Sequence, residues 1–279
     1  MEVCRTVTCL KDAIAARRGL GAVGFVPTMG ALHAGHASLV ERCRAENATV
    51  VVSIFVNPTQ FNDKNDLKNY PRTEEADIAL LESLGCDIAF VPSVEEVYPQ
   101  PDTRQFDFGA IGRVMEGAHR PGHFNGVAQV VSRLFSFVEP DRAYFGEKDF
   151  QQIAIIKAMC TQIGSRVEIV ECPIKRESDG LAMSSRNTRL TTEQRRAAPV
   201  IHMTLAASVA QREWTDVEQT KKWVIEQIDS NELMKTEYYD LVDASTMQSI
   251  DSWAHEGAVY GCIAVKVGEV RLIDNIRYK

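Results

Sequence analysis

Two histidines stand three residues apart in a glycine-bearing run, Pro27-Thr28-Met29-Gly30-Ala31-Leu32-His33-Ala34-Gly35-His36. Residues 22–26 before it are apolar and typical of a strand, and residues 37–47 after it mix apolar and charged side chains at helical spacing. The first N–H groups of a helix lack internal partners, and the helix dipole places partial positive charge there. If a helix begins inside this run, His33 and His36 project from its first turn on one side and can donate hydrogen bonds to phosphate oxygens. The run therefore predicts a nucleotide site.

The two histidines have other interpretations that the residues alone leave open. Each ring could cap or pack locally, or the pair could bind zinc. Helical zinc pairs usually sit four residues apart and need a third ligand, and the chain has no Cys-x-x-Cys. Gly30 and Gly35 allow the backbone to approach a bulky ligand closely, which favours phosphate.

Composition sets the class of protein. The 279 residues are 45% hydrophobic and 25% charged, which is ordinary for a globular chain, and the net charge of −7 speaks against a nucleic-acid-binding surface. The longest apolar run, residues 50–56, is too short to span a bilayer, and the N-terminal residues lack the apolar core of a secretory signal. Seven cysteines are dispersed without paired spacing, as expected for reduced thiols. We expect a cytoplasmic protein with no nucleic-acid or membrane partner.

Strands and helices alternate along the first part of the chain. Strands are predicted at residues 22–26, 49–56, 87–91, 142–145 and 167–171, and helices at 8–18, 37–47, 74–84, 127–137 and 149–163. This alternation predicts an α/β fold, a doubly wound, Rossmann-like parallel sheet over residues 1–174, with ligands at the carboxyl ends of its strands.

The pattern changes after residue 175. Two polar helices are predicted at 191–211 and 216–230, followed by antiparallel strands at 237–243 and 258–267 and a candidate third strand at 270–274. Residues 175–279 are therefore predicted to form a smaller C-terminal α+β domain.

One motif is a decoy. Residues 19–24 match G-x-G-x-x-G, the dinucleotide fingerprint, which must follow a strand and open a helix. Here the run follows a helix and opens a strand, so its predicted role is to end the first helix.

Three further polar blocks lie at predicted element ends. Asn57 and Gln60 follow the strand at 49–56, and Gly146-Glu147-Lys148-Asp149 follows the strand at 142–145. Lys148 is a compact cation suited to phosphate, and Asp149 would stabilise a helix start. Ser184, Ser185 and Arg186 could hold a triphosphate through charge-assisted hydrogen bonds, although Ser-Ser-Arg-Asn alone is an ordinary turn.

These blocks carry a resemblance to a known family. The first run resembles the HxGH signature of nucleotidyltransferases, and its longer form is similar to that of the pantoate–β-alanine ligases, also called pantothenate synthetases. The segments FVNPTQF, YPRT, FGEKDFQQ and the Ser184–Asn187 turn also match that family in order and spacing. The matches span residues 27–187, whereas the C-terminal region resembles the family only in length and general pattern.

The resemblance implies an ATP-dependent condensation of pantoate with β-alanine. Pantoate carboxylate attacks the α-phosphorus of ATP to give pantoyl adenylate and pyrophosphate. The amine of β-alanine then attacks the activated acyl carbon and releases pantothenate and AMP. A homodimer is also implied.

Residue roles follow from the same resemblance. Catalytic roles fall on His36, His33, Lys148, Ser184, Ser185 and Arg186, with His36 the better candidate for assisting the leaving pyrophosphate. ATP-binding positions are Met29, Gly30, Ala31, Leu32, His33, Ala34, Gly35, His36, Gly146, Glu147, Lys148, Asp149, Lys175, Met183, Ser184, Ser185 and Arg186. Lys175 stands where the family commonly has an apolar residue. Pantoate would contact Gln60, Gln152 and Asn57, under a loop that runs through Asn65.

The resemblance also implies Mg²⁺ as a cofactor beside ATP. Asp77 matches an acidic position associated with Mg²⁺, although Ala76 stands where some members have a second acid.

Two alternatives are another HxGH nucleotidyltransferase with a different acceptor and a non-catalytic nucleotide-binding protein. The blocks around Gln60 and Gln152 argue against the first, because they match the pantoate site as well as the ATP site. The presence of His33, His36 and Lys148 argues against the second.

Overall fold

The computed structural model describes residues 1–279, which divide into two compact units. The first unit comprises Met1–Phe108, Arg120–Glu147 and Gln152–Pro173. The second comprises Gly109–His119, Lys148–Gln151 and Ile174–Lys279, so two short internal segments join the C-terminal region.

The first unit is built on a six-stranded parallel sheet. In spatial order its strands are β1 (Glu2–Cys4), β4 (Ile88–Phe90), β3 (Thr49–Ile54), β2 (Val23–Thr28), β5 (Arg142–Gly146) and β6 (Glu168–Cys172). The chain runs outward from β2 to β3 and β4, and it later returns to the other side of β2 with β5. The strand order therefore reverses between β2 and β5, which is where α/β sheets of this kind bind ligands.

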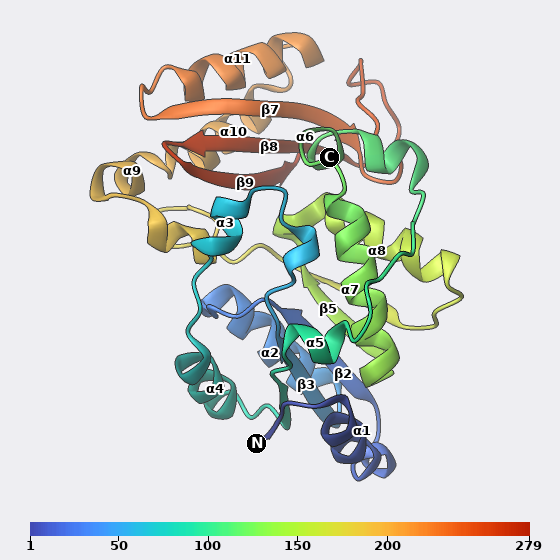
Figure 1. The fold of residues 1–279 in the computed structure, drawn as a ribbon. Coiled ribbons are helices and arrows are strands. Elements are labelled where there is room, and N and C mark those ends of the chain that lie inside the picture. Colours follow the sequence, from blue (N-terminus) through green and yellow to red (C-terminus); the bar gives the residue numbers. More distant parts are fainter. The chain divides into compact units, whose positions relative to one another are not determined.

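Helices cover both faces of this sheet (Figure 1). The covering helices are α1 (Val7–Ala15), α2 (Ala34–Glu46), α4 (Glu74–Ser83), α5 (Val94–Val97), α7 (His123–Val138) and α8 (Phe150–Gln162). The unit also contains the short helix α3 (Lys64–Lys68), which buries no residue, and the 3₁₀ turns η1 (Arg18–Leu20) and η2 (Pro58–Gln60). Neighbouring residues of β3 show the two faces. Val51 packs with apolar side chains of α1, α7 and α8, whereas Val50 and Val52 pack with those of α2 and α4. The predicted doubly wound sheet is confirmed.

The second unit contains a three-stranded antiparallel sheet. Its strands are β7 (Met234–Asp243), β8 (Val259–Val267) and β9 (Val270–Arg277), in that spatial order. Its helices are α6 (Glu116–His119), α9 (Thr192–Ala197), α10 (Val200–Gln211) and α11 (Val217–Asp229), and its 3₁₀ turns are η3 (Gly109–Arg113) and η5 (Ser185–Arg189). The turn η4 (Glu147–Asp149) begins at Glu147, the end of the first unit's middle segment, and continues into the second unit. Leu205, Val224 and Ile263 share a buried core that joins α10 and α11 to the sheet, beside which both helices lie in Figure 1.

Several element boundaries differ from the prediction for local reasons. The helix predicted at 191–211 is two helices, α9 and α10, because Pro199 lacks the N–H that a continuous helix needs. The helix predicted at 127–137 begins earlier, at His123, after Gly122 in the left-handed conformation. The short elements β1, α3, α5 and α6 have no clear periodicity in the sequence and were not predicted.

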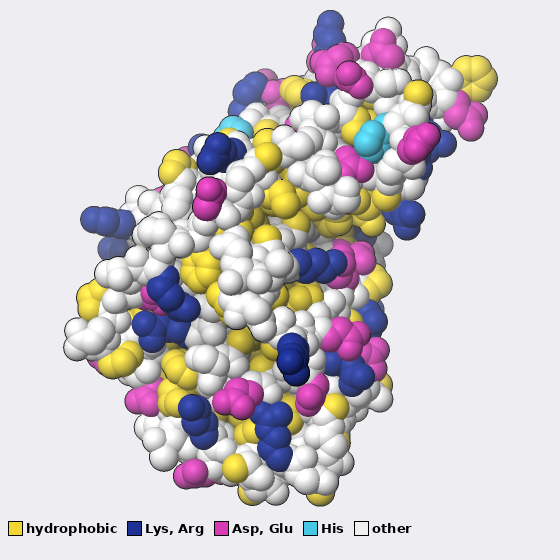
Figure 2. Space-filling view, turned by 90° about the vertical axis from the view of Figure 1, so that its right-hand side faces the viewer, with side chains coloured by type: hydrophobic (Ala, Val, Ile, Leu, Met, Phe, Trp, Pro, Cys, Tyr) yellow, Lys and Arg dark blue, Asp and Glu magenta, His cyan; other side chains and the backbone are white.

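The surface mixes both signs of charge. On the face drawn in Figure 2, Lys and Arg side chains are interspersed with Asp and Glu. None of the helices combines the length and the apolar character needed to cross a membrane.

Candidate active site

The turn after β2 is tight and left-handed. Thr28 Oγ1 donates a hydrogen bond to the Ser53 carbonyl (2.6 Å) and accepts one from the Gly30 N–H (3.2 Å). Gly30 has φ of 79° and Ala31 has φ of 49°, a conformation that costs a non-glycine residue about 1–2 kcal/mol. A Cβ on Gly30 would lie 3.0 Å from Asp77 Oδ2. The close approach that requires glycine here is thus to another part of the protein.

The side chain of Asp77, in the first turn of α4, holds the Gly30–Ala31 turn through hydrogen bonds. Its side chain is buried, at 2% exposure. Oδ2 accepts the Ala31 N–H at 2.9 Å, and Oδ1 accepts the Leu32 N–H at 2.7 Å and the Thr73 hydroxyl at 3.1 Å. Hydrogen bonds from N–H groups to a carboxylate are about twice as strong as neutral ones. Asp77 therefore offsets the strain at Ala31 and fixes the turn that leads into α2.

The predicted magnesium role of Asp77 does not fit this geometry. Both carboxylate oxygens already accept hydrogen bonds, and the group is buried beneath the turn. The one cluster of metal-ligating side chains, with ligand atoms within 4.8 Å of one another, is Glu2, Cys4 and Cys9 at β1 and α1, and Asp77 is not part of it. Mg²⁺ prefers one or two carboxylates together with substrate phosphates, so a magnesium ion here would have to arrive on the triphosphate.

The two histidines lie where α2 begins, because the helix starts at Ala34 and not at residue 37 as its apolar pattern predicted. His33 is the N-cap of the helix, and its Nδ1 accepts the Gly35 N–H at 3.1 Å. In return, His36 Nδ1 accepts the His33 N–H at 3.3 Å, and the two ring centroids are 4.1 Å apart. A ring nitrogen that accepts a hydrogen bond carries no proton, so each neutral imidazole bears its proton on Nε2. This reciprocal cap fixes the tautomer of both rings and makes Nε2–H the donor of each.

The amide of Gln60 is oriented by its neighbours in the first unit. Its Oε1 accepts a hydrogen bond from Asn57 Nδ2 (3.2 Å), and its Nε2 donates to Met29 Sδ (2.8 Å). Asn57 is only 1% exposed and also donates to the Gly126 carbonyl (3.2 Å). Asn57 is thus buried beside Gln60, and its hydrogen bond orients the Gln60 side chain.

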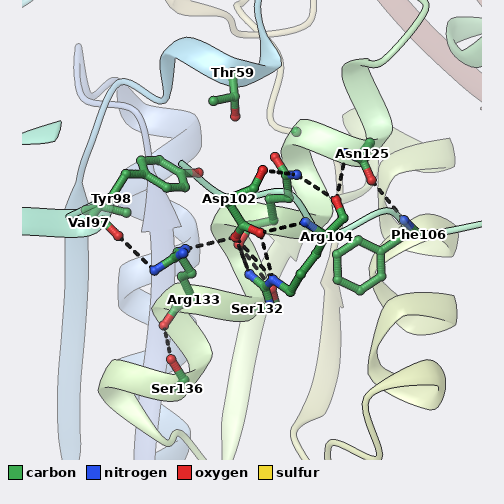
Figure 3. A network of polar contacts seen from close by, with 12 residues as sticks. Thr59, Val97, Tyr98, Asp102, Arg104, Phe106, Asn125, Ser132, Arg133 and Ser136 are labelled. Carbon is green, nitrogen blue, oxygen red and sulfur yellow. Dashed lines mark hydrogen bonds and ion pairs between the residues drawn. The ribbon is translucent and has the colours of Figure 1, made fainter. Parts of the chain in front are cut away.

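Asn57 is held in turn by Tyr98, which lies beside a network of polar contacts around Asp102 (Figure 3). The Tyr98 hydroxyl donates to Asn57 Oδ1 at 3.1 Å, and the Arg133 guanidinium lies 5.1 Å from the centre of the Tyr98 ring. Arg133 and Arg104 both bind the Asp102 carboxylate, at 2.9 and 2.6 Å, and hydrogen bonding by Arg104 is the main reason that the pKa of Asp102 lies well below its usual range. Burial raises the pKa of Tyr98, which keeps its phenol a neutral donor.

The carboxyl end of β5 carries the next predicted block. Gly146 ends strand β5 next to β2, Glu147 begins η4, and Lys148 and Asp149 follow in the second unit. Lys148 Nζ lies 3.3 Å from Asp149 Oδ2, and the Lys148 carbonyl accepts a hydrogen bond from Asn275 Nδ2 at 3.2 Å. Gln152 lies half-buried in the first turn of α8.

The Ser-Ser-Arg turn lies in the second unit. The preceding chain folds back on itself, with the Met183 N–H donating to the Lys175 carbonyl at 3.0 Å. Ser184 caps η5 by accepting the Arg186 N–H at 3.3 Å, Ser185 is buried, and Lys175 is exposed. Lys175 therefore contributes its backbone to this fold-back and leaves its side chain outside.

The predicted site residues fall into two groups. The first unit holds Met29, Gly30, Ala31, Leu32, His33, Ala34, Gly35, His36, Asn57, Gln60, Asp77, Gly146, Glu147 and Gln152, and the second holds Lys148, Asp149, Lys175, Met183, Ser184, Ser185 and Arg186. Within the first unit, the structure brings Met29, Asn57 and Gln60 together and joins Asp77 to the turn that carries the histidines.

Comparison with known proteins places this arrangement in a family. The family model described as pantoate-beta-alanine ligase matches residues 2–277. The chain belongs to the pantoate-beta-alanine ligase family. A pantothenate synthetase of Bacteroides thetaiotaomicron is 57% identical over 280 residues, covering 100% of this chain and 99% of that protein. One from Porphyromonas gingivalis is 56% identical and fully covered.

Solved structures of pantoate-beta-alanine ligases agree with this chain over its whole length. The pantothenate synthetase of Thermus thermophilus has a TM-score of 0.93 and 43% identity, covering 100% of this chain and 99% of that one. The ligase of Francisella tularensis, described as complexed with beta-gamma ATP and beta-alanine, has a TM-score of 0.82 and 34% identity, covering 100% and 98%. The chain is thus a ligase that forms an amide bond.

Sequence reasoning missed three residues that shape the site of this ligase. Tyr98 supports Asn57 from a segment with no motif, so nothing in the sequence pointed to it. Gly126 approaches the backbone of Thr59 so closely that a Cβ would lie 2.5 Å from its carbonyl oxygen. His123 Nδ1 lies 2.8 Å from the Gln60 carbonyl.

Proposed function

We propose that this ligase joins pantoate to β-alanine through a pantoyl adenylate, with ATP bound at the turn between β2 and α2. The single observation that carries the proposal is the reciprocal cap of His33 and His36, which sets two Nε2–H donors at the start of a helix. That helix end lies at the strand-order reversal of the sheet, where an anionic ligand gains both from the dipole and from backbone N–H groups.

In the first step, the pantoate carboxylate attacks the α-phosphorus and pyrophosphate leaves. No protein nucleophile is needed, because the substrate supplies one. His33 and His36 donate to phosphate oxygens, and His36 assists the leaving pyrophosphate. Lys148, Ser184, Ser185 and Arg186 hold the triphosphate, and the backbone and side chains at the other predicted ATP-binding positions complete its cradle. Catalysis then rests on positioning and on stabilisation of charge on the phosphates.

In the second step, the β-alanine amine attacks the acyl carbon of the adenylate and AMP leaves. Pantoate is held for both steps by Gln60 and Gln152. Asn57, which the sequence suggested as a direct ligand, acts by orienting the Gln60 amide, because its own polar atoms already bind Gln60, Gly126 and Tyr98.

Further expectations belong to the same proposal. Mg²⁺ enters as the MgATP substrate, and Asp77 shapes the turn beneath it. The enzyme works as a homodimer in the cytoplasm, which suits its seven free cysteines.

The test is pantoate-dependent exchange of pyrophosphate into ATP, compared between the wild type, His36→Ala and Gln60→Ala. His36→Ala should lower the exchange rate at saturation at least about 100-fold while the pantoate KM changes little. The reason is that a general acid, or a hydrogen-bond donor to the charge that develops in the transition state, is typically worth about 10²–10⁴-fold in rate. Gln60→Ala should instead raise the pantoate KM. Equal loss of rate and pantoate affinity in His36→Ala would refute the role of that ring.

A further inference from the structure

Strand β9 of the second unit buries two polar residues in succession. Asp274 is 5% exposed and Asn275 is 4% exposed, although successive side chains of a strand point to opposite faces. Because β9 is an edge strand of a three-stranded sheet, one face and the edge would ordinarily be polar and wet. Burial of a carboxylate and an amide is unfavourable unless each is hydrogen-bonded, so the partners of this pair are informative.

Asp274 anchors the segment that leads into the Ser-Ser-Arg turn. Arg176 binds its carboxylate through two bonds, Nη1 to Oδ2 at 2.7 Å and Nη2 to Oδ1 at 2.9 Å. The same guanidinium donates to the Gly180 carbonyl at 3.2 Å, and Arg176 pairs with Ala182 in an isolated bridge. Since Ser184 follows Ala182 by two residues, the ion pair fixes the base of the fold-back from which the serines project.

Asn275 anchors Lys148. Its side-chain Nδ2 donates to the Lys148 backbone carbonyl at 3.2 Å, and the backbone carbonyl of Asn275 accepts from Arg176 Nη2 at 3.3 Å. The residues beyond Lys148 are held in the same unit, because the ring of Phe150 stacks on Tyr260 of β8 with centroids 4.2 Å apart. Arg176, Asn275 and Lys148 therefore form a continuous hydrogen-bonded path, although the sequence separates Lys148 from Asn275 by 127 positions.

We infer that Asp274 and Asn275 are positioning residues for adenylate formation: this adjacent pair on β9 sets the Lys148 segment and the Ser184–Arg186 turn relative to each other. The inference rests on the proposed function of those two segments as holders of the triphosphate. The C-terminal sheet would then contribute to catalysis, because one short stretch of β9 aligns both segments of the second unit that are proposed to hold the triphosphate. Neither residue needs to touch the substrate.

The test uses the 279-residue chain, four single variants and one double variant. Asn275→Ala removes the bond to the Lys148 carbonyl, and Asp274→Asn removes the charge that holds Arg176. Asp243→Asn is the matched control, because Asp243 is also a buried acid of the same sheet with a side-chain partner, His255 Nε2 at 2.8 Å, but it contacts neither segment. Lys148→Ala provides a second background for Asn275→Ala. Exchange kinetics, ATP affinity by calorimetry and urea unfolding are measured for each.

Asn275→Ala and Asp274→Asn should lower the saturating exchange rate about 10-fold or more, because a small misplacement of catalytic groups can cost about 10²-fold. The pantoate KM of both variants should stay within about twofold of the wild-type value. The exchange rate of Asp243→Asn should also stay within about twofold of wild type. Asn275→Ala should weaken ATP binding in the wild type but have little effect in the Lys148→Ala background, because the residues act through one path. If Asp274→Asn does not fold, Asn275→Ala carries the test alone.

Three results would overturn the inference while leaving the proposed function intact. The first two are normal exchange by Asn275→Ala and equal loss of ATP affinity in both backgrounds. A loss in Asp243→Asn as large as that in Asp274→Asn would also overturn it, since general weakening of the sheet would then be the cause. Absence of pantoate-dependent exchange in the wild type would instead defeat the proposed function itself.

Discussion

Asp77→Asn is the substitution that separates a structural carboxylate from a metal ligand. In the structure, both oxygens of the buried Asp77 carboxylate are engaged, with the Ala31 and Leu32 N–H groups at 2.9 and 2.7 Å. An asparagine retains one acceptor oxygen and turns an NH₂ group toward the other backbone N–H. One hydrogen bond to a charged group is lost and one buried donor is left without an acceptor, which should lower the free energy of unfolding by about 2–3 kcal/mol.

The same change should loosen the turn that presents the two histidines. We expect the exchange rate at saturating ATP and Mg²⁺ to fall about 10- to 100-fold, equivalent to about 1.4–2.7 kcal/mol in the activation barrier. The assay is pyrophosphate exchange over a range of Mg²⁺ concentrations, combined with urea unfolding. Glu75→Gln, which removes an exposed acid from the same helix, is the control.

The alternative makes the opposite prediction for both measurements. If Asp77 were a direct magnesium ligand, Asp77→Asn would unfold at the same urea concentration as wild type, and excess Mg²⁺ would restore its rate. That pair of results would refute the reasoning from the turn. A loss of stability with a rate that Mg²⁺ does not restore would support it.

Three further predictions follow from contacts in the two units. Long-range ¹H–¹⁵N NMR at neutral pH should find the neutral rings of His33 and His36 protonated on Nε2, and an Nδ1–H tautomer at either ring would contradict the reciprocal cap. Tyr98→Phe removes one hydrogen bond to Asn57, worth about 1 kcal/mol, and should raise the pantoate KM about fivefold with little change in the ATP KM; an unchanged pantoate KM would show that the network does not orient Gln60. Burial, together with the nearby Arg176, lowers the pKa of His202 in the folded chain. As pH falls, His202 of the unfolded chain therefore takes up a proton at a higher pH than His202 of the folded chain, and the free energy of unfolding should decline from about pH 6.5 downward. His202→Asn should flatten that decline in urea unfolding between about pH 7.5 and about pH 5.5, and an unchanged slope would assign the dependence to other groups.

The sequence predicted the elements whose apolar pattern extends over several residues. The buried run at β3 and the alternation of strands with amphipathic helices were enough to predict the doubly wound sheet, because both faces of such a sheet must be covered. The helix predicted at 37–47 corresponds to α2, which begins earlier, at Ala34 within the histidine motif. The break at Pro199 was available in the sequence, but the surrounding helical pattern of residues 191–211 concealed it.

The parts that could not be predicted depend on contacts between distant positions. Asp77 reaches Leu32 across 45 positions of sequence, and nothing in its neighbourhood distinguishes a carboxylate that binds N–H groups from one that binds a metal. The sequence predicts Asn57 as a polar loop residue, yet its side chain is almost fully buried because α7 and Tyr98 pack against it. Asp274 was the last residue of the candidate strand at 270–274 and Asn275 lay beyond it, and no local pattern indicated their contacts with Arg176 and Lys148.

The most direct test of the central claim is AMP formation from MgATP and pantoate, measured with and without β-alanine. If this chain activates pantoate as an adenylate and then transfers it, sustained AMP release should require both acids and should match the pantothenate formed. Pyrophosphate exchange should need only pantoate. AMP release that is indifferent to pantoate, or pantothenate formation without any pantoate-dependent exchange, would contradict the account.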